Sequence, residues 1–274
     1  MKAFTLDLWD GFNYTGAGKD DFRPTLDCYI LKSDTPRPAV MVLPGSGYVQ
    51  CSPREAEALA IGFNAEGYHA FVLWYSCAPR RHPVPLLDCA RAFTLIRSHA
   101  AEWVLNPGKL GIMGFSAGGH LALSASVFYN RDFASVPGID PAFSRPDAAM
   151  LCYPVVSSGE YAHRGSFDAL LGSDPAPALL ELTSLEKQVH NKMPPVFIWH
   201  TWADDAVPVE NSIFLASALK KVNIPFELHI FPEGKHGLSL ANSETYNNDP
   251  EFINPQAAQW FSLCINWLNK RFEC

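Results

Sequence analysis

The feature that most constrains this chain is the alternation of short apolar runs with longer segments of helical periodicity. The runs are rich in β-branched and aromatic residues, and their near-continuous apolarity predicts strands buried on both faces. These runs are Ala39–Leu43, His69–Tyr75, Leu110–Phe115, Ala148–Tyr153, Val196–Thr201 and Phe226–Phe231. Apolar residues recur every three or four positions in Pro53–Glu66, Val84–Ala101, Gly118–Tyr129, Val209–Val222 and Pro255–Phe272. Such alternation predicts an α/β fold with a mostly parallel, doubly wound sheet flanked by helices.

The first thirty residues depart from this pattern. Phe4–Trp9 and Leu26–Leu31 read as strands, and a glycine-rich turn around Gly16 and Gly18 separates them. We therefore expect an antiparallel pair at one edge of the sheet.

Two stretches lack clear periodicity, Asn130–Pro146 and Val155–Pro195. Both follow predicted strands, so they are expected to overhang the carboxyl edge of the sheet as lid-like insertions that shape a substrate pocket. No linker interrupts the chain, and residues 1–274 are interpreted as a single domain.

Composition excludes several classes of function. The formal net charge is −7, and no dense run of Lys or Arg is present, so neither nucleic acid nor an anionic membrane is an expected partner. Asp7 and Asp10 interrupt the apolar residues of the N-terminus, which does not resemble a signal peptide. No stretch approaches the ~20 apolar residues that span a bilayer. A cytoplasmic protein is the expectation.

The cysteines predict neither a disulfide framework nor a zinc site. They number seven, are scattered along the chain and form no C-x-x-C pair. We interpret them as reduced thiols that mostly fill the core.

The strongest chemical motif is Gly114-x-Ser116-x-Gly118, which lies directly between a predicted strand and a predicted helix. That context is typical of a nucleophile elbow, in which the serine occupies a strained turn and neighbouring side chains must be absent. The helix that follows would direct amide groups at a substrate oxyanion. The alternative is a glycine-rich turn in which the serine only caps a helix.

A serine nucleophile requires a base, and a base of this kind is oriented by an acid. Of nine histidines, His236 stands in a Gly/Pro loop between the last predicted strand and the last helix. Asp204 and Asp205 both follow a predicted strand and preserve the chain order Ser, Asp, His; one of them is alternatively a helix cap. Fallback partners, which would break that order, are His163, His190, Asp168 and Asp174.

An oxyanion formed during such a reaction needs backbone N–H donors. Ala117 supplies one directly after the serine, and the loop after the strand Ala39–Leu43 offers Gly45, Ser46 or Gly47 as the second.

With these segments assigned, the chain resembles the acetyl-xylan-esterase-like and hormone-sensitive-lipase-related branch of the α/β hydrolases (BD-FAE-like). The matching segments are Pro44–Tyr48, Ser52–Glu57, Tyr75–Pro79, Pro83–Asp88, Val207–Ser212 and Phe231–Leu238. The resemblance implies Asp204 rather than Asp205 as the acid, and a carboxylic-ester hydrolase acting on small acyl groups, often acetyl, on sugars or other alcohols. Pro44 replaces the family's usual His, and Ser46 replaces a Gly, which would narrow the pocket toward acetyl.

The sequence thus predicts a serine carboxylesterase for a small-molecule ester that needs no metal or organic cofactor. Ser116 attacks, His236 moves the proton, Asp204 holds the imidazole, and Ala117 with Ser46 binds the oxyanion. Aromatic residues near strand ends could form a sugar platform or belong to the core: Tyr48, Tyr75 and Trp202 are the expected pocket residues, with Trp74 and Trp199 as further candidates.

Two other functions compete with this prediction. A prolyl-oligopeptidase-like peptidase uses the same order of residues, but it usually has a gating domain for which 274 residues leave no room. A catalytically inactive hydrolase fold that serves as a binding module is the other. A homodimer is the expected assembly.

Overall fold

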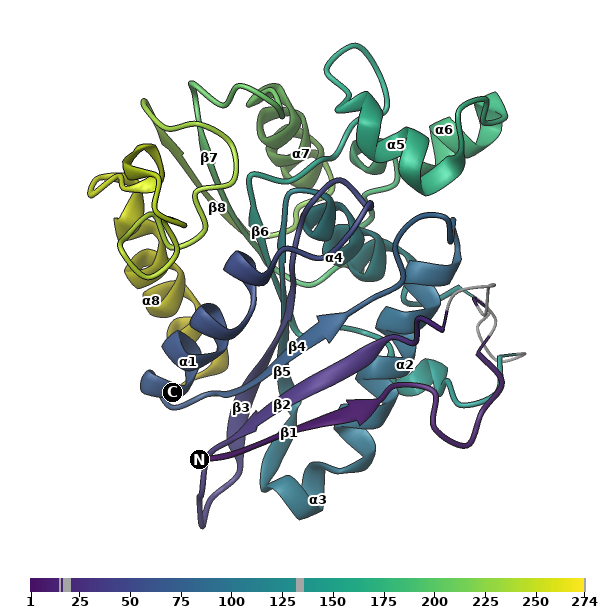
Figure 1. Ribbon diagram of the computed structural model, residues 1–274, viewed down its shortest axis with the longest axis vertical. Helices are drawn as coiled ribbons and strands as arrows, with labels where there is room; N and C mark the ends of the chain where they lie inside the picture. The colour runs from purple at the N-terminus through teal and green to yellow at the C-terminus, as the bar shows by residue number, and fades with distance from the viewer. Residues whose placement is uncertain (15, 17–20, 132–135, 274) are drawn as a thin grey trace.

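The computed structural model describes residues 1–14, 16, 21–131 and 136–273. Its eight strands form one sheet in the order β1-β2-β4-β3-β5-β6-β7-β8 (Figure 1). The strands are β1 Lys2–Asp7, β2 Thr25–Ile30, β3 Arg37–Leu43, β4 His69–Trp74, β5 Leu105–Phe115, β6 Ala148–Cys152, β7 Val196–Thr201 and β8 Phe226–Phe231. β1 pairs antiparallel with β2 and β2 with β4, whereas all pairs from β4 to β8 are parallel. The predicted mostly parallel sheet with an antiparallel edge is confirmed.

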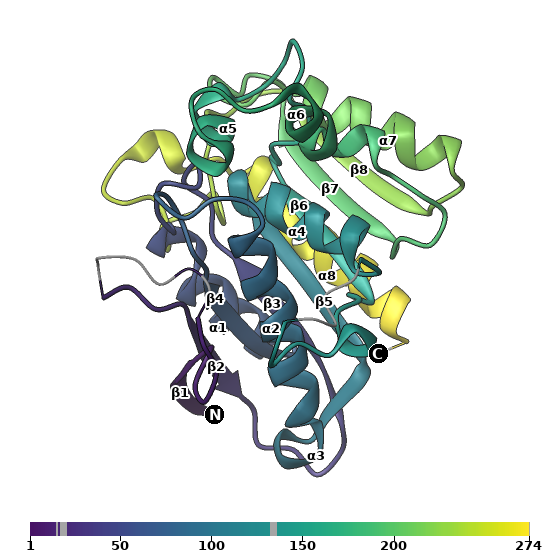
Figure 2. The same ribbon diagram turned by 90° about the vertical axis from the view of Figure 1, so that its right-hand side faces the viewer.

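Helices cover both faces of this sheet, as Figures 1 and 2 show. α1 and α8 pack on one face, and α2, α4 and α7 on the other. The helices are α1 Glu57–Ala65, α2 Val84–Ser98, α3 Ala100–Trp103, α4 Ala117–Phe128, α5 Arg164–Leu171, α6 Pro177–Thr183, α7 Glu210–Lys221 and α8 Trp260–Phe272. Short 3-10 turns lie at Pro53–Glu55, Pro141–Phe143, Leu185–Lys187, Pro250–Phe252 and Ala257–Gln259.

The apolar character of the central strands follows from this double cover. Successive strand residues point to opposite faces, so Met41 packs in the cluster under α2 and α4 while Val40 and Val42 pack in the cluster under α1 and α8. All three are fully buried. A parallel strand with helices on both sides therefore needs apolar residues at every position.

The segment Val155–Pro195 is more regular than its sequence suggests, because it contains α5 and α6. These helices have 8 and 7 residues, about two turns each, which is too short for a periodicity to repeat convincingly. α5 is nevertheless anchored, since it buries Phe167, Leu170 and Leu171. Both helices lie above the carboxyl ends of the central strands (Figure 1).

Some predicted features lie outside the described residues. Gly18 of the predicted edge turn is one, and residues 132–135 of the insertion Asn130–Pro146 are others. Within the described ranges, no helix is both long and apolar enough to cross a membrane.

Candidate active site

Ser116 stands at the junction of β5 and α4, where the chain reverses within a single residue. Its φ of 53° and ψ of −117° are unusual for a residue with a side chain, and such a conformation costs about 1–3 kcal/mol unless the surroundings impose it. Here the Ser116 N–H donates to Cys152 O at 3.0 Å, and the Val155 and His120 N–H groups donate to Ser116 O. The side chain is thereby directed out of the sheet at its carboxyl edge.

The two glycines of the motif are required by close backbone packing. A Cβ on Gly114 would lie 2.1 Å from Gly118 O, and one on Gly118 would lie 2.2 Å from Leu43 O. Any side chain at these positions would therefore push α4 away from the ends of β3 and β5.

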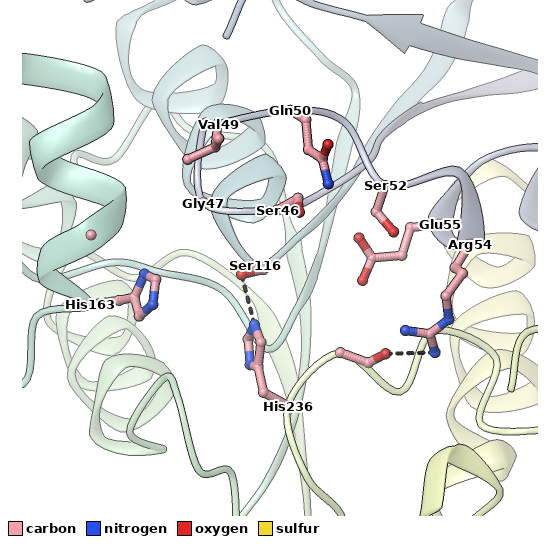
Figure 3. A pocket seen from close by; sticks show the side chains of 12 residues that line it. Ser46, Gly47, Val49, Gln50, Ser52, Arg54, Glu55, Ser116, His163 and His236 are labelled. Atoms are coloured by element: carbon pink, nitrogen blue, oxygen red, sulfur yellow. Dashed lines mark hydrogen bonds between the residues drawn. The ribbon is translucent and has the colours of Figure 1, made fainter. Parts of the chain in front are cut away.

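The structure brings the three residues predicted as a triad into one hydrogen-bonded chain. His236 Nε2 lies 2.8 Å from Ser116 Oγ (Figure 3). His236 Nδ1 lies 2.7 Å from Asp204 Oδ2. The Asp204 side chain is completely buried. Its burial favours a raised pKa, but hydrogen bonds from His200 and His236 outweigh this effect and lower the pKa below its usual value. Asp204 is therefore a carboxylate at neutral pH.

Asp205 is not the helix cap that was one alternative for it. α7 begins only at Glu210, and Asp205 Oδ1 instead accepts the His236 N–H at 3.0 Å. The two neighbouring carboxylates thus hold the same histidine, Asp204 by the ring and Asp205 by the backbone.

The predicted oxyanion donors do not all point at Ser116. Gly45 N–H donates to Glu55 Oε2 at 2.7 Å, so the prediction that Gly45 is a donor is wrong in this structure. Ser46 has a φ of 108°, which turns the backbone after Gly45. Within the described part of the chain, no acceptor is found for the N–H of Ser46 or of Ala117, and both residues adjoin Ser116.

Glu55 is a buried carboxylate that sequence reasoning missed. Besides Gly45, it accepts the Tyr153 hydroxyl at 2.6 Å, and Tyr153 in turn accepts the Ser239 N–H at 2.9 Å. Burial raises the pKa of Glu55, while the bonds from Tyr153 and Gly45 oppose the rise. An acidic residue at the start of a predicted helix is ordinarily explained by the helix dipole, so no signal in the sequence distinguished it.

Tyr75 fixes the loop 44–47, which Glu55 holds through Gly45, from the opposite side. Its hydroxyl donates to Pro44 O at 2.6 Å, and Ser52 N–H donates to Gly45 O at 3.0 Å. The loop 44–47 is therefore fixed on both sides although Pro44 has no side-chain donor.

A pocket of about 480 Å³ opens in front of Ser116 (Figure 3). Polar residues contribute much of its lining, namely Ser46, Gln50, Ser52, Arg54, Glu55, His163 and His236. Arg54 is fixed by donation to Thr245 O and Gly237 O. His163 and Gly165 come from the insertion Val155–Pro195, so this insertion does line the pocket, whereas no described residue of Asn130–Pro146 does.

The aromatic residues expected in this pocket lie elsewhere. Tyr48 is 2% exposed, with its hydroxyl 2.9 Å from His120 Nδ1, and Tyr75 is buried beneath the loop. Trp202 is 71% exposed and lines no part of the pocket. The prediction was wrong because side-chain direction depends on backbone turns such as the φ of 60° at Tyr48.

The fallback histidines do not contact Ser116. His163 Nδ1 lies 2.8 Å from Ser166 Oγ, and His190 Nε2 lies 2.9 Å from Val127 O. His200, in β7, lies 3.2 Å from Asp204 Oδ2 through Nε2 and 2.8 Å from Ser212 Oγ through Nδ1. It is a second, buried partner of the acid.

The serine occupies a sharp turn between a strand and a helix at the carboxyl edge of a mostly parallel sheet, and Asp and His follow it in chain order. This combination defines an α/β hydrolase. Comparison with known families agrees. The BD-FAE model matches residues 26–145, and the prolyl oligopeptidase family model matches residues 88–258. The chain belongs to the α/β-hydrolase family.

Particular relatives are more informative about chemistry. A solved acetyl ester-xyloside bifunctional hydrolase from Caldicellulosiruptor lactoaceticus is 40% identical, with a TM-score of 0.87 over 97% of this chain and 96% of that one. Endo-1,4-beta-xylanase B of Butyrivibrio fibrisolvens is 39% identical over 90% of this chain, and an acetylxylan esterase of Xylanibacter ruminicola is 30% identical over 90%. The chain spans only 40% and 50% of the length of these two curated relatives.

The elbow packing leads to a first prediction. Gly118→Ala places a methyl group against Leu43 O, and overpacking of this kind costs about 3 kcal/mol. The Tm, measured by circular dichroism, should fall by about 6 °C or more. In the control Gly108→Ala, the nearest atom to the new Cβ is 3.6 Å away, so its Tm should stay near the wild-type value. Equal Tm values for the two variants would contradict this account of the motif.

A second prediction concerns Glu55 as a positioning residue. Glu55→Ala removes the acceptor of the Gly45 N–H, so the neighbouring Ser46 N–H should lose its position and kcat for p-nitrophenyl acetate should fall about 10- to 100-fold. KM should change much less, because an oxyanion exists only in the transition state. Glu55→Gln keeps an acceptor oxygen and should retain more activity than Glu55→Ala. Glu57→Ala, on the exposed start of α1, serves as the control, and equal kinetics of Glu55→Ala and Glu57→Ala would refute the role.

Proposed function

We propose that this chain is a serine carboxylesterase that hydrolyses short-chain esters, acetyl esters above all, through an acyl-enzyme. The observation that carries the proposal is the contact of Ser116 Oγ with His236 Nε2, 2.8 Å apart in the lining of an open pocket. The names of two relatives, an acetylxylan esterase and an acetyl ester-xyloside bifunctional hydrolase, support ester hydrolysis.

The first half of the proposed reaction forms the acyl-enzyme. Ser116 Oγ attacks the ester carbonyl carbon while its proton passes to His236 Nε2. Negative charge develops on the carbonyl oxygen, where the N–H groups of Ala117 and Ser46 stabilise it. Collapse of the tetrahedral intermediate breaks the bond to the alcohol, which takes the proton from His236 as it leaves.

Water completes the cycle. His236 accepts a proton from the attacking water, and the same proton later returns to Ser116 Oγ as the carboxylic acid is released. The buried carboxylate of Asp204 accepts the Nδ1–H of His236, which fixes the tautomer and stabilises the imidazolium in both halves of the reaction.

Polar side chains in the pocket wall favour a hydroxyl-rich alcohol over an alkyl alcohol. Gln50, Ser52 and Arg54 present amide, hydroxyl and guanidinium groups to the space in front of Ser116. An alkyl chain would desolvate these groups without replacing their hydrogen bonds, whereas sugar hydroxyls would replace them. Acetylated sugars, xylo-oligosaccharides among them, are the proposed substrates.

Peptide hydrolysis is the second candidate, because the prolyl oligopeptidase model matches residues 88–258. A binding module without activity is the third. We further propose a cytoplasmic location and a homodimer, which fractionation and light scattering would test.

The central prediction is that Ser116→Ala loses p-nitrophenyl acetate hydrolysis by about 10³-fold or more, while Ser124→Ala, in the helix α4 that follows Ser116, keeps it. Wild type should release acetate from acetylated xylo-oligosaccharides, should leave prolyl p-nitroanilide peptides intact, and should be labelled at Ser116 by a fluorophosphonate. Preferential cleavage of the peptides would favour the peptidase. Absence of both labelling and turnover would favour the binding module.

A further inference from the structure

A second hollow, of about 250 Å³, adjoins the catalytic pocket. Val49 and Gln50 line both hollows, so they form a ridge between them. Val49 is 64% exposed at the crest of this ridge, and Figure 3 shows the Gln50 amide on the side of Ser52 and Glu55. A ligand that leaves the catalytic pocket across this ridge enters the second hollow directly.

Aromatic side chains held by other residues form the walls of the second hollow. Trp74, at the end of β4, donates its indole N–H to Asp27 Oδ2 at 2.6 Å. Phe22 is 37% exposed, and the Arg80 guanidinium lies over its ring, 4.7 Å from the centroid of that ring. Arg80 is itself anchored by donation from Nε to Gly16 O at 2.9 Å. Such walls are preorganised, so a ligand meets them with little loss of side-chain entropy.

The composition of the hollow selects among ligands. Aromatic faces, with the Arg80 guanidinium over Phe22 and the Gln50 amide at the ridge, suit a ligand with a flat C–H face and hydroxyl groups at its edge, which describes a pyranose ring. An acyl chain would also gain from Phe22 and Trp74, but it would leave the Gln50 amide at the ridge without the hydrogen bond that a ring hydroxyl supplies. Because the volume is below the roughly 300–1,000 Å³ typical of drug-sized ligands, one ring is the expected occupant.

We propose that this hollow, bounded by Phe22, Trp74 and Arg80 beyond the ridge of Val49 and Gln50, is a subsite for the sugar ring next to the acetylated one. The proposal rests on the proposed esterase function, which it makes more specific. The protein is then an oligosaccharide deacetylase that binds at least two consecutive rings.

The kinetic test is the ratio of kcat/KM for acetylated xylotriose to kcat/KM for p-nitrophenyl acetate. A subsite contact contributes to the first constant only, whereas a loss of folded enzyme lowers both and leaves the ratio unchanged. Phe22→Ala should reduce the ratio about three- to tenfold, and Trp74→Ala should reduce it similarly. The matched control is Phe214→Ala on α7, which removes a ring of similar exposure, 38%, that packs against Tyr161.

A binding test separates the subsite from the chemistry. Xylotriose without acetyl groups should bind wild type and Phe214→Ala equally in isothermal titration calorimetry, and Phe22→Ala should bind it about three- to tenfold more weakly. Binding without cleavage of any ester would support the subsite and refute the esterase.

Three results would overturn the subsite. The first is an equal ratio of kcat/KM for acetylated xylotriose to kcat/KM for p-nitrophenyl acetate in Phe22→Ala and Phe214→Ala. The second is an equal affinity of these two variants for xylotriose. The third is an effect of Phe22→Ala confined to p-nitrophenyl octanoate, which would assign the hollow to an acyl chain.

Discussion

The close approach of α4 to the ends of β3 and β5 is the contact on which the candidate site depends. Gly118 lies against the carbonyl of Leu43, closer than any side chain would permit. That contact places three parts of the site side by side: the Ser116 side chain, the first amide of α4 and the loop that begins at Pro44. The proposed nucleophile and the proposed oxyanion donors thus share one backbone junction, and their geometry does not require the ordering of separate flexible loops.

What the sequence could predict follows from how local each signal is. The strands could be predicted from the sequence because a strand buried on both faces requires a continuous run of apolar residues, as in β3 and β7. Ser116, Asp204 and His236 could be predicted because adjacent residues show the type of loop in which each one lies. The order of the three residues along the chain supported the same prediction. Their hydrogen-bonded arrangement needs only the parallel sheet that the same pattern predicts.

What the sequence could not predict depends on contacts between distant segments. Glu55 accepts a hydrogen bond from Tyr153, which lies 98 positions further along the chain. The sequence around either residue contains no pattern that predicts this contact. Tyr48 was misassigned for a different reason, since a positive φ turned a side chain expected in the pocket into the core. The residues that line the pocket are therefore harder to predict than the motif around Ser116, because their positions depend on many such turns and long-range contacts.

The environment of Asp204 explains why its carboxylate can be buried and charged at once. Oδ1 accepts two backbone N–H groups, from Ala206 at 3.0 Å and Val207 at 2.8 Å, while Oδ2 faces both His236 and His200. Removal of a single partner would leave part of the desolvation cost uncompensated. Every donor around this carboxylate except His236 is fixed by the backbone or by burial. Of the two histidines that face Oδ2, His200 has a fully buried side chain whereas His236 is 19% exposed, so the residue proposed to exchange protons with substrate and water is the one with access to solvent.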